Sequence, residues 1–316
     1  ALKFYKTCKA QGIKPIIGCE FYVSPESRFQ KQGSESKNRY YHLVLLAQNH
    51  QGYMNLIQLS SRGYTEGFYY KPRIDKELLE QYHEGLIASS ACLAGEIPRL
   101  ILEGKAEEAE QTALWFRDLF GEGNFYLELQ DHGIPEQKTV NDELKHMSKR
   151  TGIPLIATND LHYIHLEDAK AQDALICIGT NKKLHEEKRL RFDSDQFYLK
   201  SEEEMRSLFS DTPEALENTL KIAERCNLEI DLPGPQLPYY EIPEEFSSLE
   251  EYLESLTMEG LAQRYSPVSE EIYQRARKEL DIINSMGFPG YFLVVWDFID
   301  WAKKQDIPVG PGRGSG

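Results

Sequence analysis

The stretch IPLIATNDLHY, residues 153–163, places a short apolar run directly before an aspartate and a histidine. The run predicts a buried strand, and Asp160 and His162 then follow just past its end. A carboxylate and an imidazole so close together suit Zn, Mn or Fe. Alternatively, Asn159 or Asp160 caps the following turn and His162 is a surface residue. The pair alone leaves both interpretations open.

Other apolar runs in the first 160 residues alternate with helical patterns. Ala109, Ala113, Phe116 and Phe120 recur at helical spacing within 107–120, and a second such pattern covers 138–151. Strand–helix alternation is typical of parallel strands, so we expect an α/β layer or barrel. The remaining strand candidates are IKPIIGCEFYV, YYHLVLLAQ, GLIASSACL and FYLELQ.

Residues able to ligate metals sit at or just past the ends of several candidate strands. They are Glu20, Cys92 and Glu128, whereas His42 begins its run and needs a short or bent strand to join them. The carboxyl ends of parallel barrel strands converge on one mouth, where active sites are built. Cys92 alone is more typical of a small buried hydrophobe than of a ligand. His132 in LQDHG is interpreted as a turn residue rather than a supporting donor.

The composition excludes several classes of protein. The chain has 316 residues, 41% of them hydrophobic, and a net charge of −15. This charge disfavours a self-sufficient nucleic-acid binder and suits a protein that collects cations. Five cysteines without a C-x-x-C pair favour a reducing cytoplasm over a disulfide framework. No apolar run predicts a membrane span, and both chain ends look cut, as in a segment of something longer.

The second part of the chain is predicted to be helical. The proline-rich stretch 231–245 is the best candidate linker, and we place the domain division between 1–235 and 236–316. The chain ends in VGPGRGSG, residues 309–316, in which glycine backbone and the Arg313 and Ser315 side chains could bind phosphate. A flexible linker is the alternative. The polar segment 25–39 is predicted to be an exposed loop.

A resemblance joins these observations. The block GFPGYFLVVWDFIDWAKKQDIPVGPGRGSG, residues 287–316, resembles the opening of the palm domain of C-family bacterial replicative DNA polymerases. The upstream blocks match the same family in order, so the likeness covers essentially the whole chain. They are GIKPIIGCEFYV, HLVLLAQNHQGYMNLIQLSS, GLIASSACLAGEI, FYLELQDHGIPEQ, IPLIATNDLHY and RLRFDSDQFYLKSEEEM.

The resemblance implies a polymerase-and-histidinol-phosphatase (PHP) domain, a distorted parallel β/α barrel that here lacks its first strands, followed by helices leading into the palm. The resemblance also implies a cluster of Zn²⁺ or Mn²⁺ ions in this domain, and it assigns no metal-ligand role to Glu128. It also implies that Arg313, Gly314 and Ser315 hold the triphosphate of the incoming nucleotide, in a palm that uses Mg²⁺. The cluster ligands that it implies in this chain are Glu20, His42, Cys92, Asp160 and His162.

The implied parent protein copies primer-template DNA from dNTPs, with a sliding clamp and a clamp loader as partners. Its PHP domain, when metal-binding, removes mispaired nucleotides as a 3′–5′ exonuclease. The family's other cluster ligands precede this chain and its palm carboxylates lie beyond Gly316, so we expect the segment alone to be inactive and poorly soluble. Two alternatives remain: a stand-alone PHP phosphoesterase, and a non-catalytic structural domain of the replisome.

Overall fold

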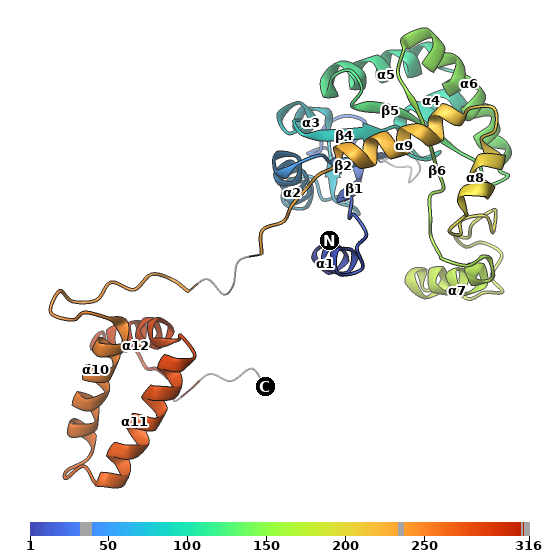
Figure 1. The fold of residues 1–316 in the computed structure, drawn as a ribbon. Helices are drawn as coiled ribbons and strands as arrows, with labels where there is room; N and C mark the ends of the chain where they lie inside the picture. Colours follow the sequence, from blue (N-terminus) through green and yellow to red (C-terminus); the bar gives the residue numbers. More distant parts are fainter. Residues whose placement is uncertain (32–39, 233–236, 311, 313–316) are drawn as a thin grey trace. The chain divides into compact units, whose positions relative to one another are not determined.

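The chain forms two compact units, and each is described here by itself (Figure 1). A computed structural model describes residues 1–31, 40–232, 237–310 and 312. The first unit is Ala1–Ile230 and the second is Asp231–Gly316. The division therefore falls at the beginning of the proline-rich stretch that the sequence marked as a linker.

One sheet of six strands, in the order β3-β1-β2-β4-β5-β6, organises the first unit. Each of the five strands that the sequence predicted is present, and β3, a strand of two residues, was missed. The α/β class is therefore confirmed. The strands are β1 (Gly18–Val23), β2 (Tyr41–Ala47), β3 (Arg73–Ile74), β4 (Leu86–Ser89), β5 (Phe125–Gln130) and β6 (Leu155–Thr158).

The expectation of parallel strands throughout is wrong, because β2 runs antiparallel to both of its neighbours, β1 and β4. The other pairs, β1 with β3, β4 with β5 and β5 with β6, are parallel. A parallel connection needs a crossover, usually a helix, but the segment between β1 and β2 has no helical period. The strand order is linear, so the described strands form an open mixed sheet rather than a closed parallel barrel.

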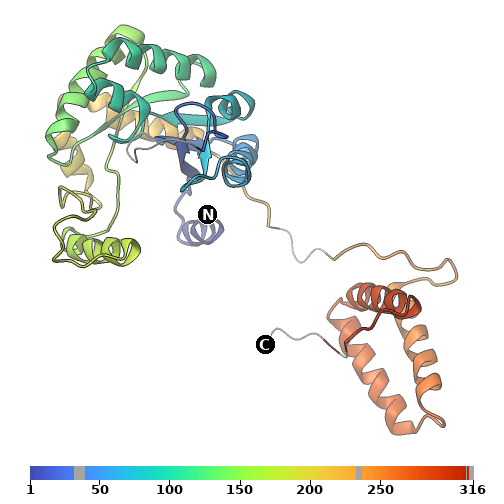
Figure 2. The same cartoon turned by 180° about the vertical axis from the view of Figure 1, so that it is seen from behind.

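Helices cover both faces of this sheet, as Figures 1 and 2 show. Ile87, Tyr126 and Ile156 on three successive strands pack against Ile222 of α9 and Cys226, the residue that ends this helix. Their strand neighbours point the opposite way into the main core, with α5 and α6. The helices are α1 (Leu2–Ala10), α2 (His50–Thr65), α3 (Lys76–Gln81), α4 (Glu96–Leu102), α5 (Ala106–Phe120), α6 (Pro135–Thr151), α7 (Ala169–Thr180), α8 (Glu202–Leu208) and α9 (Pro213–Arg225).

The predicted helix ends agree with the structure. Gly152 ends α6 with φ +74°, a left-handed conformation that glycine adopts without strain. Ser201 and Glu204 form a reciprocal capping box at the beginning of α8. Pro213 is the first residue of α9, after Thr212. These local signals are short-range, which explains why they could be found in the sequence.

The second unit contains three described helices, α10 (Leu249–Arg264), α11 (Glu270–Ser285) and α12 (Pro289–Lys304). Leu253, Leu280 and Leu293 form its small core, one from each helix. Among the described residues, no single helix is long and apolar enough to cross a membrane; α11 and α12 pass that test only as a pair bent by 115°.

Candidate metal centre

The antiparallel direction of β2 brings His42 to the edge of the sheet where β1 ends. In the register of this pair, Tyr22 of β1 lies directly opposite His42, and Glu20 lies opposite Val44. His42 therefore needs neither a short strand nor a bend to join the other candidates. Glu20 and His42 come from neighbouring strands, and Cys92 reaches them from the loop after β4.

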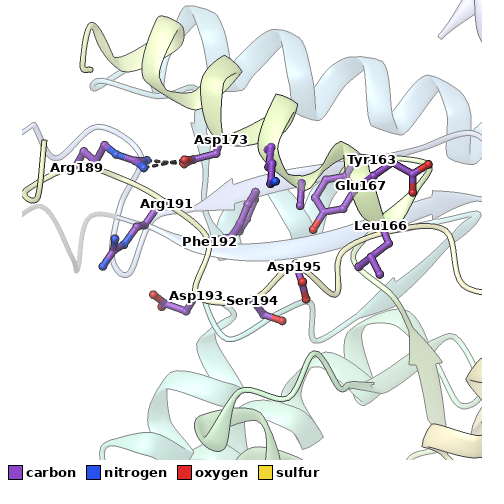
Figure 3. Close-up of a pocket in the computed structure, with 12 residues that line it drawn as sticks. Tyr163, Leu166, Glu167, Asp173, Arg189, Arg191, Phe192, Asp193, Ser194 and Asp195 are labelled. Carbon is purple, nitrogen blue, oxygen red and sulfur yellow. Dashed lines mark hydrogen bonds and ion pairs between the residues drawn. The ribbon is translucent and has the colours of Figure 1, made fainter. Parts of the chain in front are cut away.

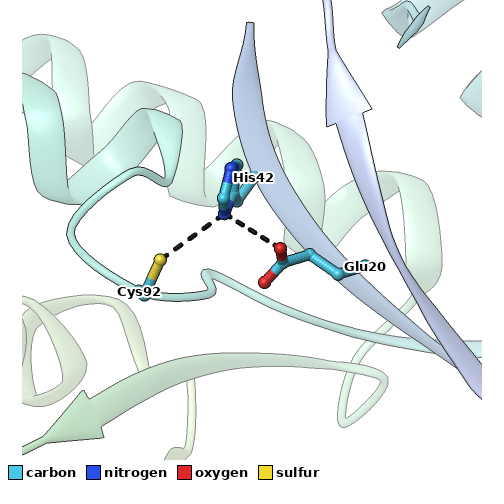
Figure 4. A group of neighbouring side chains, drawn as sticks. All are labelled: Glu20, His42 and Cys92. Atoms are coloured by element: carbon cyan, nitrogen blue, oxygen red, sulfur yellow. Dashed lines mark hydrogen bonds and ion pairs between the residues drawn. The ribbon is translucent and has the colours of Figure 1, made fainter. Parts of the chain in front are cut away.

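Glu20, His42 and Cys92 converge on one point (Figure 4). One ligand atom from each residue lies within 4.8 Å of the others. His42 Nδ1 is 3.0 Å from Glu20 Oε1 and 3.6 Å from Cys92 Sγ. A carboxylate oxygen, an imidazole nitrogen and a sulfur at this spacing form a donor set that fits a divalent transition metal.

A tight loop holds Cys92 in this position. Ala91 has φ +59°, in the left-handed region, and the Gly95 amide donates to the Cys92 carbonyl at 2.8 Å. A Cβ on Gly95 would lie only 2.1 Å from the Ser90 carbonyl oxygen, so no larger residue fits there without movement of the backbone. The close packing around the loop explains why the Cys92 thiol is largely removed from water.

Burial, together with the nearby carboxylates of Asp160, Glu20 and Glu128, raises the pKa of the Cys92 thiol to about 12. The thiol is therefore protonated at neutral pH unless a cation compensates the charge of the thiolate. A site of this kind favours a metal cation for two reasons. The ion balances the negative charge of the surrounding carboxylates, and it replaces the proton of the thiol.

Asp160 and His162 lie in the loop after β6, outside the three-residue cluster. Burial raises the pKa of the Asp160 carboxyl. The charges of His162, Glu20 and His42 also influence this pKa, so Asp160 lies near the three-residue cluster. His162 Nδ1 lies 2.6 Å from the Asp160 carbonyl oxygen. This nitrogen must carry the proton, so Nε2 keeps the lone pair that a metal would need.

His132 is buried and forms a hydrogen bond to the loop that carries Asp160, so its interpretation as a turn residue is wrong. Only 1% of its surface is exposed. Its Nε2–H donates to the Asn159 carbonyl oxygen at 2.7 Å, and its Nδ1 accepts from Gln137 Nε2 at 2.8 Å. The ring also stacks on Phe197, with centroids 4.0 Å apart. His132 thus anchors the residue immediately before Asp160.

Glu128 is fully buried near the cluster, but its oxygens already have partners. It accepts hydrogen bonds from Thr158 Oγ1 at 2.5 Å, from Gln130 Nε2 at 2.9 Å and from Ser89 Oγ. Burial raises the pKa of this carboxyl, and the hydrogen bonds oppose the rise. The structure therefore puts Glu128 in a polar network beneath the site rather than among the three converging residues.

A cavity of about 800 Å³ is lined by residues from 163–173 and 189–195 (Figure 3). Phe192, which lines it, lies 4.7 Å from the His162 ring. Arg189 is paired with Asp173 at 2.5 and 2.7 Å, so this guanidinium is not free for a phosphate. The cavity has a mixed charge, with four carboxylates and three cations. These are Glu167, Asp173, Asp193 and Asp195 together with Lys170, Arg189 and Arg191.

The phosphate site that the sequence predicts lies at the end of the chain. Arg313, Gly314 and Ser315 lie outside the described residues, as does most of the polar segment 25–39.

Two family models match the chain. The first, PHP domain, matches residues 1–132, which include Glu20, His42 and Cys92. The second, bacterial DNA polymerase III alpha NTPase domain, matches residues 251–316. A PHP-type metal-site fold followed by part of a polymerase domain is the class that the resemblance implied.

The relatives identify the family more narrowly. The chain is 57% identical over 316 residues to the DNA polymerase III subunit alpha of Treponema pallidum, 55% identical to that of Borreliella burgdorferi and 39% identical to that of Thermus aquaticus. It belongs to the bacterial DNA polymerase III alpha subunit family. All of this chain is matched, but it spans only 27%, 28% and 31% of these relatives.

Proposed function

We propose that this chain is a segment of the catalytic subunit of a bacterial replicative DNA polymerase, comprising a metal-binding PHP domain and the beginning of the palm. The observation that carries the proposal is the identity of 57% over all 316 residues with one alpha subunit. A stand-alone PHP phosphoesterase fits less well, because the polymerase model matches 251–316. We place the parent protein in the cytoplasm.

The metal centre consists, in this proposal, of Glu20, His42, Cys92, Asp160 and His162. The cysteine sulfur favours Zn²⁺ over Mn²⁺, since thiolates are soft ligands and Mn²⁺ prefers oxygen. A bound metal would supply an activated water and neutralise phosphate charge during hydrolysis of a nucleic-acid end. His132 keeps the Asp160 loop in position, and Cys92 loses its thiol proton when the metal binds.

The proposed reaction of this centre is 3′–5′ removal of mispaired nucleotides. In the parent polymerase, Arg313, Gly314 and Ser315 bind the triphosphate of the incoming dNTP, and Mg²⁺ serves DNA synthesis on a primer-template. A sliding clamp and a clamp loader are the proposed protein partners. These assignments rest on the resemblance and on the names of the relatives.

The test uses a full-length polymerase that contains this sequence, with a primer ending in a mismatch. Asp160→Asn should abolish excision of the mismatched nucleotide while extension of a matched primer continues. His146→Ala, which changes an exposed histidine of α6, is the control and should leave both activities unchanged. Unaltered mismatch removal by Asp160→Asn would refute the exonuclease proposal.

A further inference from the structure

The face of the β1–β2 pair that carries Glu20 and His42 continues into aromatic side chains. Tyr22 is two residues after Glu20, and Tyr40 is two residues before His42, so both rings point to the same face as the candidate ligands. The ring centroids of Tyr22 and Tyr40 lie 4.5 Å apart. The His42 ring is 5.3 Å from Tyr22 and 6.0 Å from Tyr40.

Two further side chains extend this group away from the candidate metal centre. Lys71 places its Nζ 5.7 Å from the centroid of the Tyr22 ring, and it forms no ion pair with a carboxylate of the described residues. Tyr64 of α2 is 61% exposed, and its phenol is close enough to Tyr22 to interact with it electrostatically. The result is a partly exposed cluster of rings with one available cation at its edge.

Partly exposed rings with an adjacent cation are the arrangement by which proteins hold unpaired bases. Every base can stack on an aromatic ring, and a lysine can neutralise the neighbouring phosphate. A duplex buries its bases in its own stack, so this surface favours a single strand. Its continuity with His42 would bring the strand to the candidate metal centre.

We propose that Tyr22, Tyr40, Tyr64 and Lys71 form a stacking platform that holds the unpaired bases of a single-stranded DNA end beside Glu20, His42 and Cys92. This inference rests on the proposed function, because it names the substrate surface of the same centre. The net charge of −15 repels DNA at long range. Stacking must therefore supply most of the affinity, and the salt dependence should be shallow.

The experiment uses the 316-residue chain after cooperative thermal unfolding has shown that it is soluble and folded. It measures binding of a short 5′-fluorescein oligothymidine by fluorescence anisotropy, with excess chelator to exclude metal bridges. Tyr40→Leu and Tyr22→Leu should each weaken binding by about 5- to 150-fold, the effect of losing one stacked base. Tyr40→Phe should bind like the parent chain, because the ring is kept. Lys71→Met should reduce the slope of log K against log salt by about 0.7.

Two controls separate recognition from folding. Tyr64→Ala changes an exposed side chain, so it should weaken binding without changing the circular dichroism spectrum or the thermal midpoint. Tyr265→Ala removes an exposed tyrosine, 46% accessible, of the second unit and should have no effect on binding. A duplex of the same length should compete poorly.

The proposal is overturned if the leucine variants and Tyr64→Ala bind the oligonucleotide as well as the parent chain, or if the parent chain does not bind it. A separate zinc titration keeps the two proposals apart. Metal binding without oligonucleotide binding contradicts the platform alone. Oligonucleotide binding without metal binding contradicts the metal centre.

Discussion

Metal binding by this chain should depend steeply on pH, because Cys92 must lose its thiol proton. Its pKa is raised to about 12 by burial and then by nearby carboxylates. A pH of 7 lies about five units below this pKa. Deprotonation of the thiol at pH 7 therefore costs roughly 7 kcal/mol of metal-binding free energy, at about 1.36 kcal/mol per unit. Each unit of pH increase removes one unit of that cost until the pH reaches the pKa of the thiol.

The assay is a titration with Co²⁺, under anaerobic conditions, that follows the thiolate-to-metal charge-transfer absorption. Between about pH 7.5 and pH 9, where imidazoles and carboxylates ordinarily hold a constant charge, the dissociation constant should fall about tenfold per unit. Cys92→Ser should remove the charge-transfer band and most of the slope.

Cys19→Ser is the matched control. Cys19 neighbours Glu20 on β1, so its side chain points to the opposite face of the strand and should not contact the ion. The control variant should therefore keep both the absorption band and the slope. A pH-independent affinity in the parent chain, or loss of the slope in Cys19→Ser, would refute the assignment of Cys92.

Three other predictions concern the scaffold of the site. Asp75 is buried, caps α3 and pairs with the buried Arg28, so Asp75→Ala should destabilise the first unit by about 3–5 kcal/mol. Glu77→Gln removes an exposed partner of the same guanidinium and should lower the free energy of unfolding by less than about 1 kcal/mol. Urea denaturation measures both variants. The unfolding is followed by Trp115 fluorescence in a background with Trp296 and Trp301 replaced by phenylalanine. His132→Ala should weaken zinc binding about 10- to 100-fold in a competition assay by releasing the Asp160 loop, while exposed His146→Ala should not. Gly95→Ala should lower the thermal midpoint and weaken zinc binding, because its Cβ would lie 2.1 Å from the Ser90 carbonyl; an unchanged midpoint would contradict the tight-loop argument.

The strands could be predicted because each is an apolar run bounded by polar residues, and the buried sheet has helices on both faces. Their directions could not, since the run YYHLVLLAQ has the same pattern in a parallel or an antiparallel strand. The error mattered for His42, whose place beside Glu20 depends on the antiparallel register. β3 was missed because two residues, Arg73 and Ile74, are too few to show any period.

The candidate site was predicted from residue types at strand ends and from the resemblance. The structure adds what depends on contacts between distant segments. The sequence LQDHG is typical of a turn, and nothing local shows that His132 is buried against Phe197 and bonded to Asn159. The neighbouring rings of Tyr22 and Tyr40 likewise depend on strand pairing across a long intervening segment.

Anomalous diffraction from crystals of this chain grown with zinc tests most directly whether Glu20, His42 and Cys92 bind a metal. We expect an anomalous peak bounded by the Glu20 carboxylate, His42 Nδ1 and Cys92 Sγ, with a Zn–S distance of about 2.3 Å. A zinc-saturated crystal without a peak at this position, or with zinc only at surface residues elsewhere, would contradict it.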